Sequence, residues 1–311
     1  MLDNFNPEMI TLARDLRGHS QGELAHKLGI NQATLSKIEG GIVGPSEDLV
    51  PSIATCLDLP HSFFRQKFRI YSMGTHAYMY RKRQKMSAKS RKMIESTVNV
   101  LRHHIETLLR SMDIDSPLTI PQLPPDEYGA PEKIAEMVRA QWMAPNGPIQ
   151  NMTELLEDAG VVIIRCDFGT RSMDATSIWL PGTQPLIFVN KELPGDRWRF
   201  TLAHELGHLV MHAIPTDQME KEADYFAAAF LMPASDIRPD FNKPALKHFA
   251  NNLKPYWKVS IASLIERAHQ LGKISDNQRR YFHMNMNKYG IRDPEPNALP
   301  REHPTIPSTI D

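Results

Sequence analysis

The sequence predicts an α+β fold that is mostly helical. Residues 6–68 carry the periodicity of short helices, and three strand-like stretches lie between residues 161 and 190. Long helical patterns resume at residue 195. Strands confined to so short a part of a 311-residue chain can form only a small sheet, which the helices must cover.

The length and composition indicate a globular protein of two or three domains, with 41% apolar and 23% charged residues. No run approaches the roughly 18–20 apolar residues of a membrane span, and residues 1–4 do not begin a signal peptide. Cys56 and Cys166 lie far apart without metal-pair spacing, which indicates reduced thiols. We therefore expect a cytoplasmic protein with no membrane partner.

Charge is unevenly distributed, although the net charge is zero. Residues 69–110 hold ten Lys and Arg against two Asp and Glu, whereas residues 131–240 hold nine against sixteen. A basic block, of which residues 80–92 are the densest part, suits contacts with phosphate. A solvated helix face explains the same block equally well.

Residues 19–41, HSQGELAHKLGINQATLSKIEGG, predict two short helices joined by a tight turn. Ser20 and Glu23 have the spacing of a capping box, so the first helix begins directly after Ser20. Gly29 ends this helix and Asn31 caps the next one. Such a pair is a helix-turn-helix. The outward face of its second helix carries side chains that can bind base edges or phosphates: Gln32, Thr34, Ser36 and Lys37.

Residues 8–64 resemble the XRE family of Cro/repressor-like domains. The residues that carry the resemblance are Arg14, Gln21, Leu24, Ala25, Ser36, Ile38, Glu39, Gly41, Pro45 and Ser46. With the helical periodicity, the resemblance implies a five-helix DNA-binding domain over residues 1–68 that recognises a double-stranded operator. The implied DNA-binding residues are Gln21, Gln32, Thr34, Ser36 and Lys37. A helical domain that makes only protein contacts is the alternative.

The region between the two recognisable parts is expected to be a connector over residues 69–130. Residues 87–110 have the pattern of one amphipathic helix, whose apolar face packs within the protein or forms the seam of a homodimer. His103 and His104 are adjacent on this helix and point apart, which argues against a joint metal site. Residues 113–131 are rich in proline and acidic residues and read as a linker.

Residues 204–208 read HELGH, the H-E-x-x-H pattern that is typical of zinc peptidases. His204 and His208 are four residues apart, so both imidazoles face one side of a helix over 195–212. Both can reach one ion at about 2 Å from each nitrogen. Glu205 does not point at that ion, but it can take a proton from water beside it as a general base. Strand-like stretches at 161–166, 176–180 and 185–190 precede the helix.

A zinc site of this kind needs a third protein ligand. The metzincin extension requires glycine at 211 and histidine at 214, but the chain has Met211 and Ile214. A carboxylate from a second helix is the remaining common solution. Residues 216–233 predict such a helix, and periodicity alone does not choose among its acidic residues Glu220, Glu222 and Asp224.

Residues 130–270 resemble the ImmA/IrrE family of zinc metallopeptidases. The resemblance rests on RFTLAHELGHLVMH followed by EKEADYFAAAFLMP, and on the preceding SIWLPGTQPLIFVN and GDRWRF. It implies a gluzincin-like minimal metallopeptidase core that holds Zn²⁺ on His204, His208 and Glu222, with Glu205 as the catalytic base. Glu220 is the fallback ligand, and Asp224 an outer partner. The stretch 185–190 is the expected edge strand for an extended substrate.

Other polar residues near the motif have less specific expectations. His212 has turned about 80° away from His204 and is not expected to be a ligand. Arg197 and Arg199 form surface ion pairs or contact a substrate carboxylate. Residues 256–290 resemble another helix-turn-helix; we expect them to pack under a peptidase domain spanning 131–285, with nucleic-acid contact as the alternative. Residues 286–311, with five prolines, read as an extended tail.

Two functions are compatible with these patterns. The first is a DNA-binding transcriptional regulator with a zinc endopeptidase domain that cleaves a regulatory protein, such as a repressor, an antitoxin or the chain itself. The second is a non-proteolytic repressor or antitoxin whose peptidase-like domain senses a metal or a ligand. An intact set of His204, Glu205 and His208 favours the first.

Overall fold

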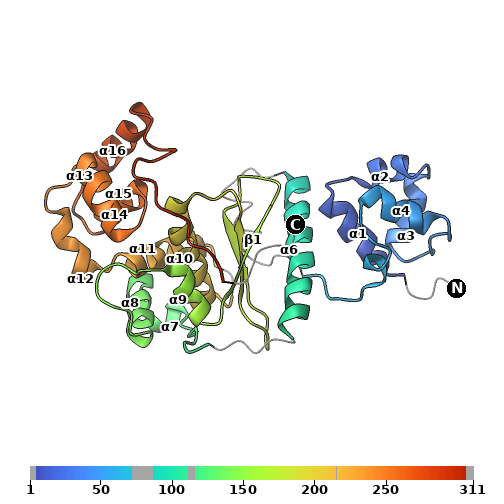
Figure 1. Cartoon of the computed structure of the whole chain (residues 1–311), viewed down its shortest axis with the longest axis horizontal. Helices are drawn as coiled ribbons and strands as arrows, with labels where there is room; N and C mark the ends of the chain where they lie inside the picture. The colour runs from blue at the N-terminus through green and yellow to red at the C-terminus, as the bar shows by residue number, and fades with distance from the viewer. Residues whose placement is uncertain (1–4, 72–86, 111–115, 215, 306–311) are drawn as a thin grey trace. The chain divides into compact units, whose positions relative to one another are not determined.

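The computed structural model describes residues 5–71, 87–110, 116–214 and 216–305. The chain divides into two compact units, Met1–Asp113 with Phe168–Ser172, and Ile114–Asp167 with Met173–Asp311 (Figure 1). Helices dominate both units and a small three-stranded sheet belongs to the second, so the predicted fold class is confirmed. Within the described ranges, no helix is long and apolar enough to cross a membrane.

The first unit contains the helix-turn-helix. Ser20 forms the predicted capping box: its hydroxyl accepts from the Glu23 N–H, and Glu23 accepts from the Ser20 N–H. Gly29 continues the chain into the turn at a φ of 67°, a left-handed conformation that favours glycine. Of the five predicted helices, four are α-helices and the fifth is a single 3₁₀ turn. They are α1 (Pro7–Leu16), α2 (Gln21–Lys27), α3 (Gln32–Glu39), α4 (Leu49–Leu57) and η1 (Phe63–Arg65).

Helix α6 (Ala88–Leu109) packs against α1 within the same unit. Ile94, Val98 and Ile105 of its apolar face are buried. The half-buried ring of His103 stacks on Phe68 at 4.0 Å between ring centroids. Much of the predicted basic block lies outside the described residues, which omit 72–86.

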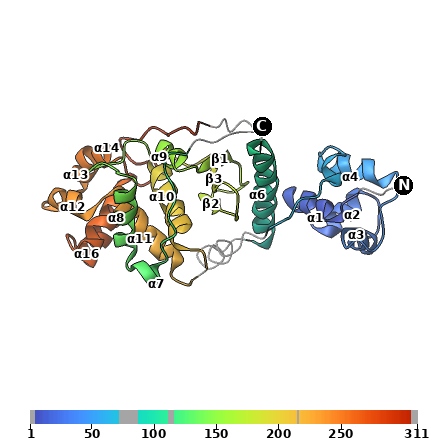
Figure 2. The same cartoon turned by 90° about the horizontal axis from the view of Figure 1, so that it is seen from below.

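The sheet of the second unit has the order β1-β3-β2. Strand β3 (Leu186–Asn190) pairs in parallel with β1 (Val162–Cys166) and antiparallel with β2 (Ala175–Ile178). The prediction that 185–190 forms an edge strand is therefore wrong. All five β3 residues are buried, as expected for a strand that is paired on both sides and covered. Helices α9 and α10 lie against the sheet (Figure 2).

Helix α10 (Gly195–Met211), the longest described helix of the second unit, packs mainly against α11 (Met219–Leu231). Gly207 of α10 lets α11 approach closely, because a Cβ there would lie 3.1 Å from the Phe226 ring and 3.3 Å from the Ala223 Cα. The larger apolar core forms around these two helices. The elements are α7 (Pro125–Tyr128), α8 (Pro131–Gln141), α9 (Met152–Asp158), α10 (Gly195–Met211), α11 (Met219–Leu231), α12 (Ala234–Ile237), η2 (Arg238–Phe241), α13 (Leu246–His248), η3 (Phe249–Leu253), α14 (Lys254–Trp257), α15 (Ile261–Gln270) and α16 (Asp276–Lys288).

Two segments that the sequence marks as a linker and a tail pack on this core. In residues 116–130, the Leu123 N–H donates to the Val210 carbonyl at 2.8 Å. Residues 291–305 carry no regular element, yet the Leu299 N–H donates to Asp196 Oδ1 at 2.7 Å. The prolines of these two segments therefore produce an irregular backbone, and hydrogen bonds to the core hold that backbone in place.

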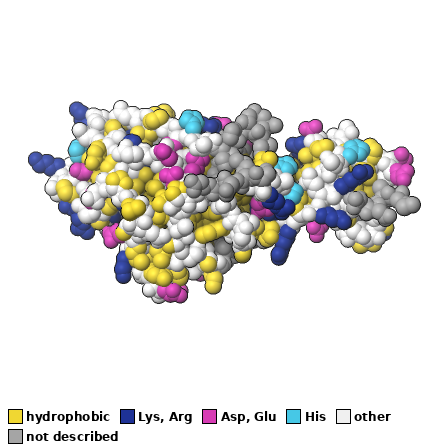
Figure 3. All heavy atoms as spheres, turned by 60° about the horizontal axis from the view of Figure 1, so that its bottom comes forward, with side chains coloured by type: hydrophobic (Ala, Val, Ile, Leu, Met, Phe, Trp, Pro, Cys, Tyr) yellow, Lys and Arg dark blue, Asp and Glu magenta, His cyan; other side chains and the backbone are white. Residues whose placement is uncertain are grey.

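The second unit also exposes several large apolar side chains. Hydrophobic side chains lie between scattered charged ones on the face drawn in Figure 3. The exposed set in this unit includes Met143, Trp179, Ile214, Tyr256, Tyr281, Met284 and Tyr289.

Candidate metal centre and DNA-facing helix

Helix α10 brings the two motif histidines together. The Nε2 atoms of His204 and His208 are 3.0 Å apart, because a spacing of four residues places both side chains on one helix face. The His208 side chain is 1% exposed and that of His204 is 15% exposed. Two imidazole nitrogens converge at the end of a buried helix, as a metal site requires.

The carboxylate that joins these histidines comes from Glu220 of α11. Its Oε1 lies 3.4 Å from His208 Nε2 and its Oε2 lies 3.7 Å from His204 Nε2. One ligand atom from each of the three residues lies within 4.8 Å of the others, and no second group of this kind occurs in the described parts of the chain.

Glu222, the ligand implied by the family resemblance, is not part of this cluster and lies against His212. Its Oε2 is 3.0 Å from Nε2 of His212. Residues two apart on a helix differ by about 200° in direction, so Glu220 and Glu222 cannot face the same point. The sequence did contain a signal that favours Glu220. Glu220 and Asp224 are four residues apart, so they share one face of the helix. Both lie against His204.

The contacts of the two Nδ1 atoms are compatible with lone pairs on both Nε2 atoms, which is the form in which histidine binds a metal. His204 Nδ1 is 2.9 Å from Asp224 Oδ1, and His208 Nδ1 is 3.0 Å from His212 Nδ1. If His212 donates from Nε2 to Glu222, its Nδ1 accepts a hydrogen bond from the Nδ1–H of His208, and His208 keeps a lone pair on Nε2. On this assignment His204 and His208 each donate from Nδ1 and keep a lone pair on Nε2, as metal-binding histidines do.

The surroundings shift the pKa values of two of these histidines in opposite directions. Burial lowers the pKa of His204, but the hydrogen bond and charge of Asp224 outweigh burial and leave it raised. Burial lowers the pKa of His212 more than Glu222 raises it. His212 therefore favours the neutral form, which can accept from His208.

Glu205 lies near His204 and Glu220, whose charges act on its carboxyl group, and it also reaches the sheet. Its side chain is buried, and its Oε2 accepts a hydrogen bond from Ser177 Oγ at 2.7 Å. Burial raises the pKa of Glu205, and the charge of His204 and the bond from Ser177 oppose that rise. Ser177 lies on β2, which is an edge strand of the sheet. Nothing in the sequence marked this serine.

The two arginines before the motif form ion pairs away from the cluster. Arg197 pairs with Asp174. Arg199 is buried, pairs with Glu302 and donates to the carbonyl oxygens of Ile149 and Gln150. Both arginines thus form ion pairs, which is one of the two roles expected for them from the sequence.

Helix α3 exposes the predicted DNA-facing residues Gln32, Thr34, Ser36 and Lys37. Gln21 differs, because it is half-buried and its amide donates to Glu39 Oε2 at 2.7 Å. Arg14 donates to the other oxygen of Glu39, also at 2.7 Å. Gln21 and Arg14 thus join α1, α2 and α3 from inside.

Comparison with known families gives one match in the region of the helix-turn-helix and one in the region of the metal centre. Residues 10–64 match the family model for a helix-turn-helix, and residues 156–269 match that for the IrrE N-terminal-like domain of peptidase family M78. This chain carries both domains. The helix-turn-helix and the IrrE-like domain were each predicted from the sequence, and these predictions are confirmed.

A search of curated proteins found no match. Among solved structures, the chain is similar to PlcR of Bacillus thuringiensis, crystallised in complex with the peptide PapR7 and DNA. The two are 13% identical over 93% of this chain and 97% of PlcR, with a TM-score of 0.19. A similarity at that level carries no argument about this chain.

Proposed function

We propose that this protein is a DNA-binding regulator whose IrrE-like domain is a zinc-dependent endopeptidase that cleaves a regulatory protein. The observation that carries the proposal is the convergence of His204, His208 and Glu220, with the buried Glu205 close enough for its charge to act on His204. Two imidazoles and one carboxylate are a donor set that suits Zn²⁺ and leaves a position open for catalysis.

Each residue of the site has a separate role in this proposal. His204, His208 and Glu220 would hold the ion, and zinc would supply Lewis acidity toward water and the scissile carbonyl. Glu205 would accept the proton of the attacking water and later donate it to the leaving amine. Burial raises the pKa of Glu205, which favours its taking up a proton from water. Ser177 would orient the carboxylate through its hydrogen bond.

Strand β2 is the better place for an extended substrate, since β3 is paired on both sides. Among the described residues, no strand pairs with the outer edge of β2, and a peptide backbone can pair there by β-augmentation. Ser177 joins this strand to Glu205 directly, so a peptide on β2 would pass close to the general base. A protein substrate with a mobile, extended segment fits this arrangement.

The helix-turn-helix domain would place α3 in the major groove of an operator. Gln32, Thr34, Ser36 and Lys37 are exposed on α3 and have the chemistry of base-edge and phosphate contacts. We assign Gln21 to the support of α3, because its amide is already bonded to Glu39. On this proposal, the expected substrate is a regulatory protein that is bound at the same promoter.

The test compares wild type with Glu205→Gln in cells that carry the gene. New protein N-termini are mapped by mass spectrometry, and operator occupancy is measured by chromatin immunoprecipitation. We expect a set of N-termini that depends on wild type and disappears in Glu205→Gln. Glu154→Gln, at an exposed glutamate of α9, is the matched control and should retain them.

Identical N-termini in wild type and Glu205→Gln, with unchanged regulation, would remove the peptidase from the proposal and leave a DNA-binding regulator. If chelation abolished regulation while Glu205→Gln did not, the metal would be structural or sensory. That result would establish the non-proteolytic alternative.

A further inference from the structure

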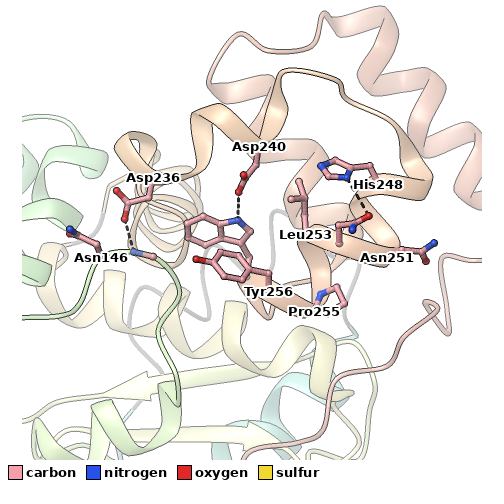
Figure 4. Close-up of a pocket in the computed structure, with 11 residues that line it drawn as sticks. Asn146, Asp236, Asp240, His248, Asn251, Leu253, Pro255 and Tyr256 are labelled. Atoms are coloured by element: carbon pink, nitrogen blue, oxygen red, sulfur yellow. Dashed lines mark hydrogen bonds between the residues drawn. The ribbon is translucent and has the colours of Figure 1, made fainter.

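The second unit contains a cavity of about 890 Å³ in its C-terminal helical part. It lies among α12, η2 and the helical run through α13, η3 and α14 (Figure 4). None of the three clustered metal-site residues lines it. Its volume falls within the roughly 300–1,000 Å³ of small-molecule sites, and no role has yet been assigned to it.

One wall of the cavity is built by an unusual turn of helix. Residues Phe249–Leu253 form a π-helical turn between α13 and α14. Such turns are rare and occur frequently at functional sites. This one contributes Asn251, Asn252 and Leu253 to the cavity wall. The widened turn therefore shapes the cavity itself.

The cavity wall carries two carboxylates, Asp236 and Asp240, and no Lys or Arg among its described residues. The lysines of the neighbouring helix are engaged elsewhere. Lys254 is fully buried and pairs with Asp196 and Glu295, and Lys258 donates to Gln150. The wall also carries one histidine, His248, and the charge of the buried Arg139 acts on Asp236 from outside the cavity. With two carboxylates and no Lys or Arg among the lining residues, it suits a positively charged ligand.

Both carboxylates are fixed in position. Asp240 Oδ2 accepts from the indole N–H of Trp257 at 2.9 Å, and Asp236 Oδ2 accepts from the Gly147 N–H at 2.6 Å. Figure 4 draws both hydrogen bonds at the cavity. Each carboxylate keeps further lone pairs, since a carboxylate can accept about four hydrogen bonds. A ligand would thus meet charges that are already ordered, which lowers the entropic cost of binding.

The loop that carries Gly147 is held from behind by a buried cation. Arg139 donates to the carbonyl oxygens of Pro145 and Gly147 and to that of Phe230. It does not line the cavity. The Gly147 N–H therefore stays in place to orient Asp236.

An aromatic ring completes the site. Tyr256 is 58% exposed, and its ring meets that of Trp257 edge-on at 5.4 Å between centroids. An aromatic face beside carboxylates attracts a cation, most strongly a flat or alkylated one. We propose that this cavity binds a small organic cation, in which an amidinium, guanidinium or ammonium group is attached to a flat or apolar body. The acidic wall disfavours nucleotides and other anions.

The experiment compares two ligands that differ in charge and little in shape. Benzamidine is a flat cation and benzamide is its neutral counterpart. Titration of the full-length chain by calorimetry should show saturable binding of benzamidine, with benzamide at least about tenfold weaker. Asp236→Asn and Asp240→Asn remove charge but keep an acceptor for Gly147 and Trp257, and each should weaken benzamidine about fivefold or more.

Two further variants keep the result interpretable. Asp126→Asn, at an exposed aspartate of α7, is the matched control and should leave benzamidine affinity unchanged. Tyr256→Ala alters an exposed side chain, so it should weaken benzamidine without shifting the melting temperature even if an aspartate variant misfolds.

Equal affinity for the two ligands would overturn the proposal, as would binding that is unaffected by Asp236→Asn, Asp240→Asn and Tyr256→Ala. The proposal does not depend on peptidase activity. Glu205→Gln protein should bind benzamidine like wild type, whether or not the metal centre cleaves peptides.

Discussion

Glu302 forms an ion pair with Arg199 of the metal-site helix α10, 103 residues earlier in the chain. The Glu302 side chain is 12% exposed and that of Arg199 is 3% exposed. Oε2 of Glu302 also accepts from the N–H and the hydroxyl of Thr153, at 2.8 and 2.9 Å. The C-terminal segment thus ties α9 to α10 one turn before His204.

Glu302→Gln should destabilise the second unit, because it leaves the buried Arg199 without a counter-charge. Removing one partner of a buried ion pair costs roughly 3–5 kcal/mol. Urea unfolding followed by tryptophan fluorescence measures the loss, since all four tryptophans belong to this unit. Lys191→Gln breaks an exposed pair with Asp167 and should cost less than about 1 kcal/mol. If Glu302→Gln and Lys191→Gln lowered the free energy of unfolding equally, the C-terminal segment would not support α10.

Glu220→Gln should weaken zinc binding far more than Glu222→Gln. The first change removes a candidate ligand, and we expect a loss on the order of 100-fold or more. The second acts only through His212 and His208, for which roughly 10-fold is expected. Competition with a chromogenic chelator gives both affinities. The reverse order would restore Glu222 as the ligand that the family resemblance implies.

The first unit should lose stability in mild acid, partly through His103. Burial, followed by the charge of His104, lowers the pKa of His103. The unfolded chain, with a histidine pKa of about 6.5, then binds more protons than the folded one. Stability therefore falls as the pH drops below about 6.5 and levels off below the folded pKa.

Calorimetry of the full chain at pH 7.5 and 5.5 tests this expectation. His103→Gln should reduce the pH dependence of the first unit's transition, and His61→Gln, at an exposed histidine, should not. A pH dependence that is identical in all three proteins would show that His103 titrates alike in the folded and unfolded chain.

Lys37→Ala and Gln32→Ala should weaken DNA binding in different ways. Loss of a phosphate-contacting lysine lowers affinity for all duplexes and reduces the salt slope by about 1, whereas loss of a base-reading glutamine costs roughly 1–3 kcal/mol at one position. Duplexes selected by the wild-type chain provide the probe, and anisotropy across a salt series the measurement. Lys27→Ala on α2 is the control. Wild-type binding by all three variants would show that α3 does not face DNA.

Features that depend on local spacing could be predicted from the residues alone. The capping box at Ser20, the turn at Gly29 and the shared face of His204 and His208 follow from contacts between residues within one or two helical turns. The same local patterns placed α10, α11 and the three strands close to their observed positions.

Contacts between residues that are distant in the chain could not be predicted in this way and are seen only in the folded protein. Strand order depends on pairing between segments, and this is why β3 proved to be central and β2 an edge. Whether Glu220 or Glu222 lies against the two histidines depends on how α11 is rotated against α10, and in the structure it is Glu220 that joins them. Ser177 and Glu302 reach α10 from far away in the chain, and no periodicity records such contacts.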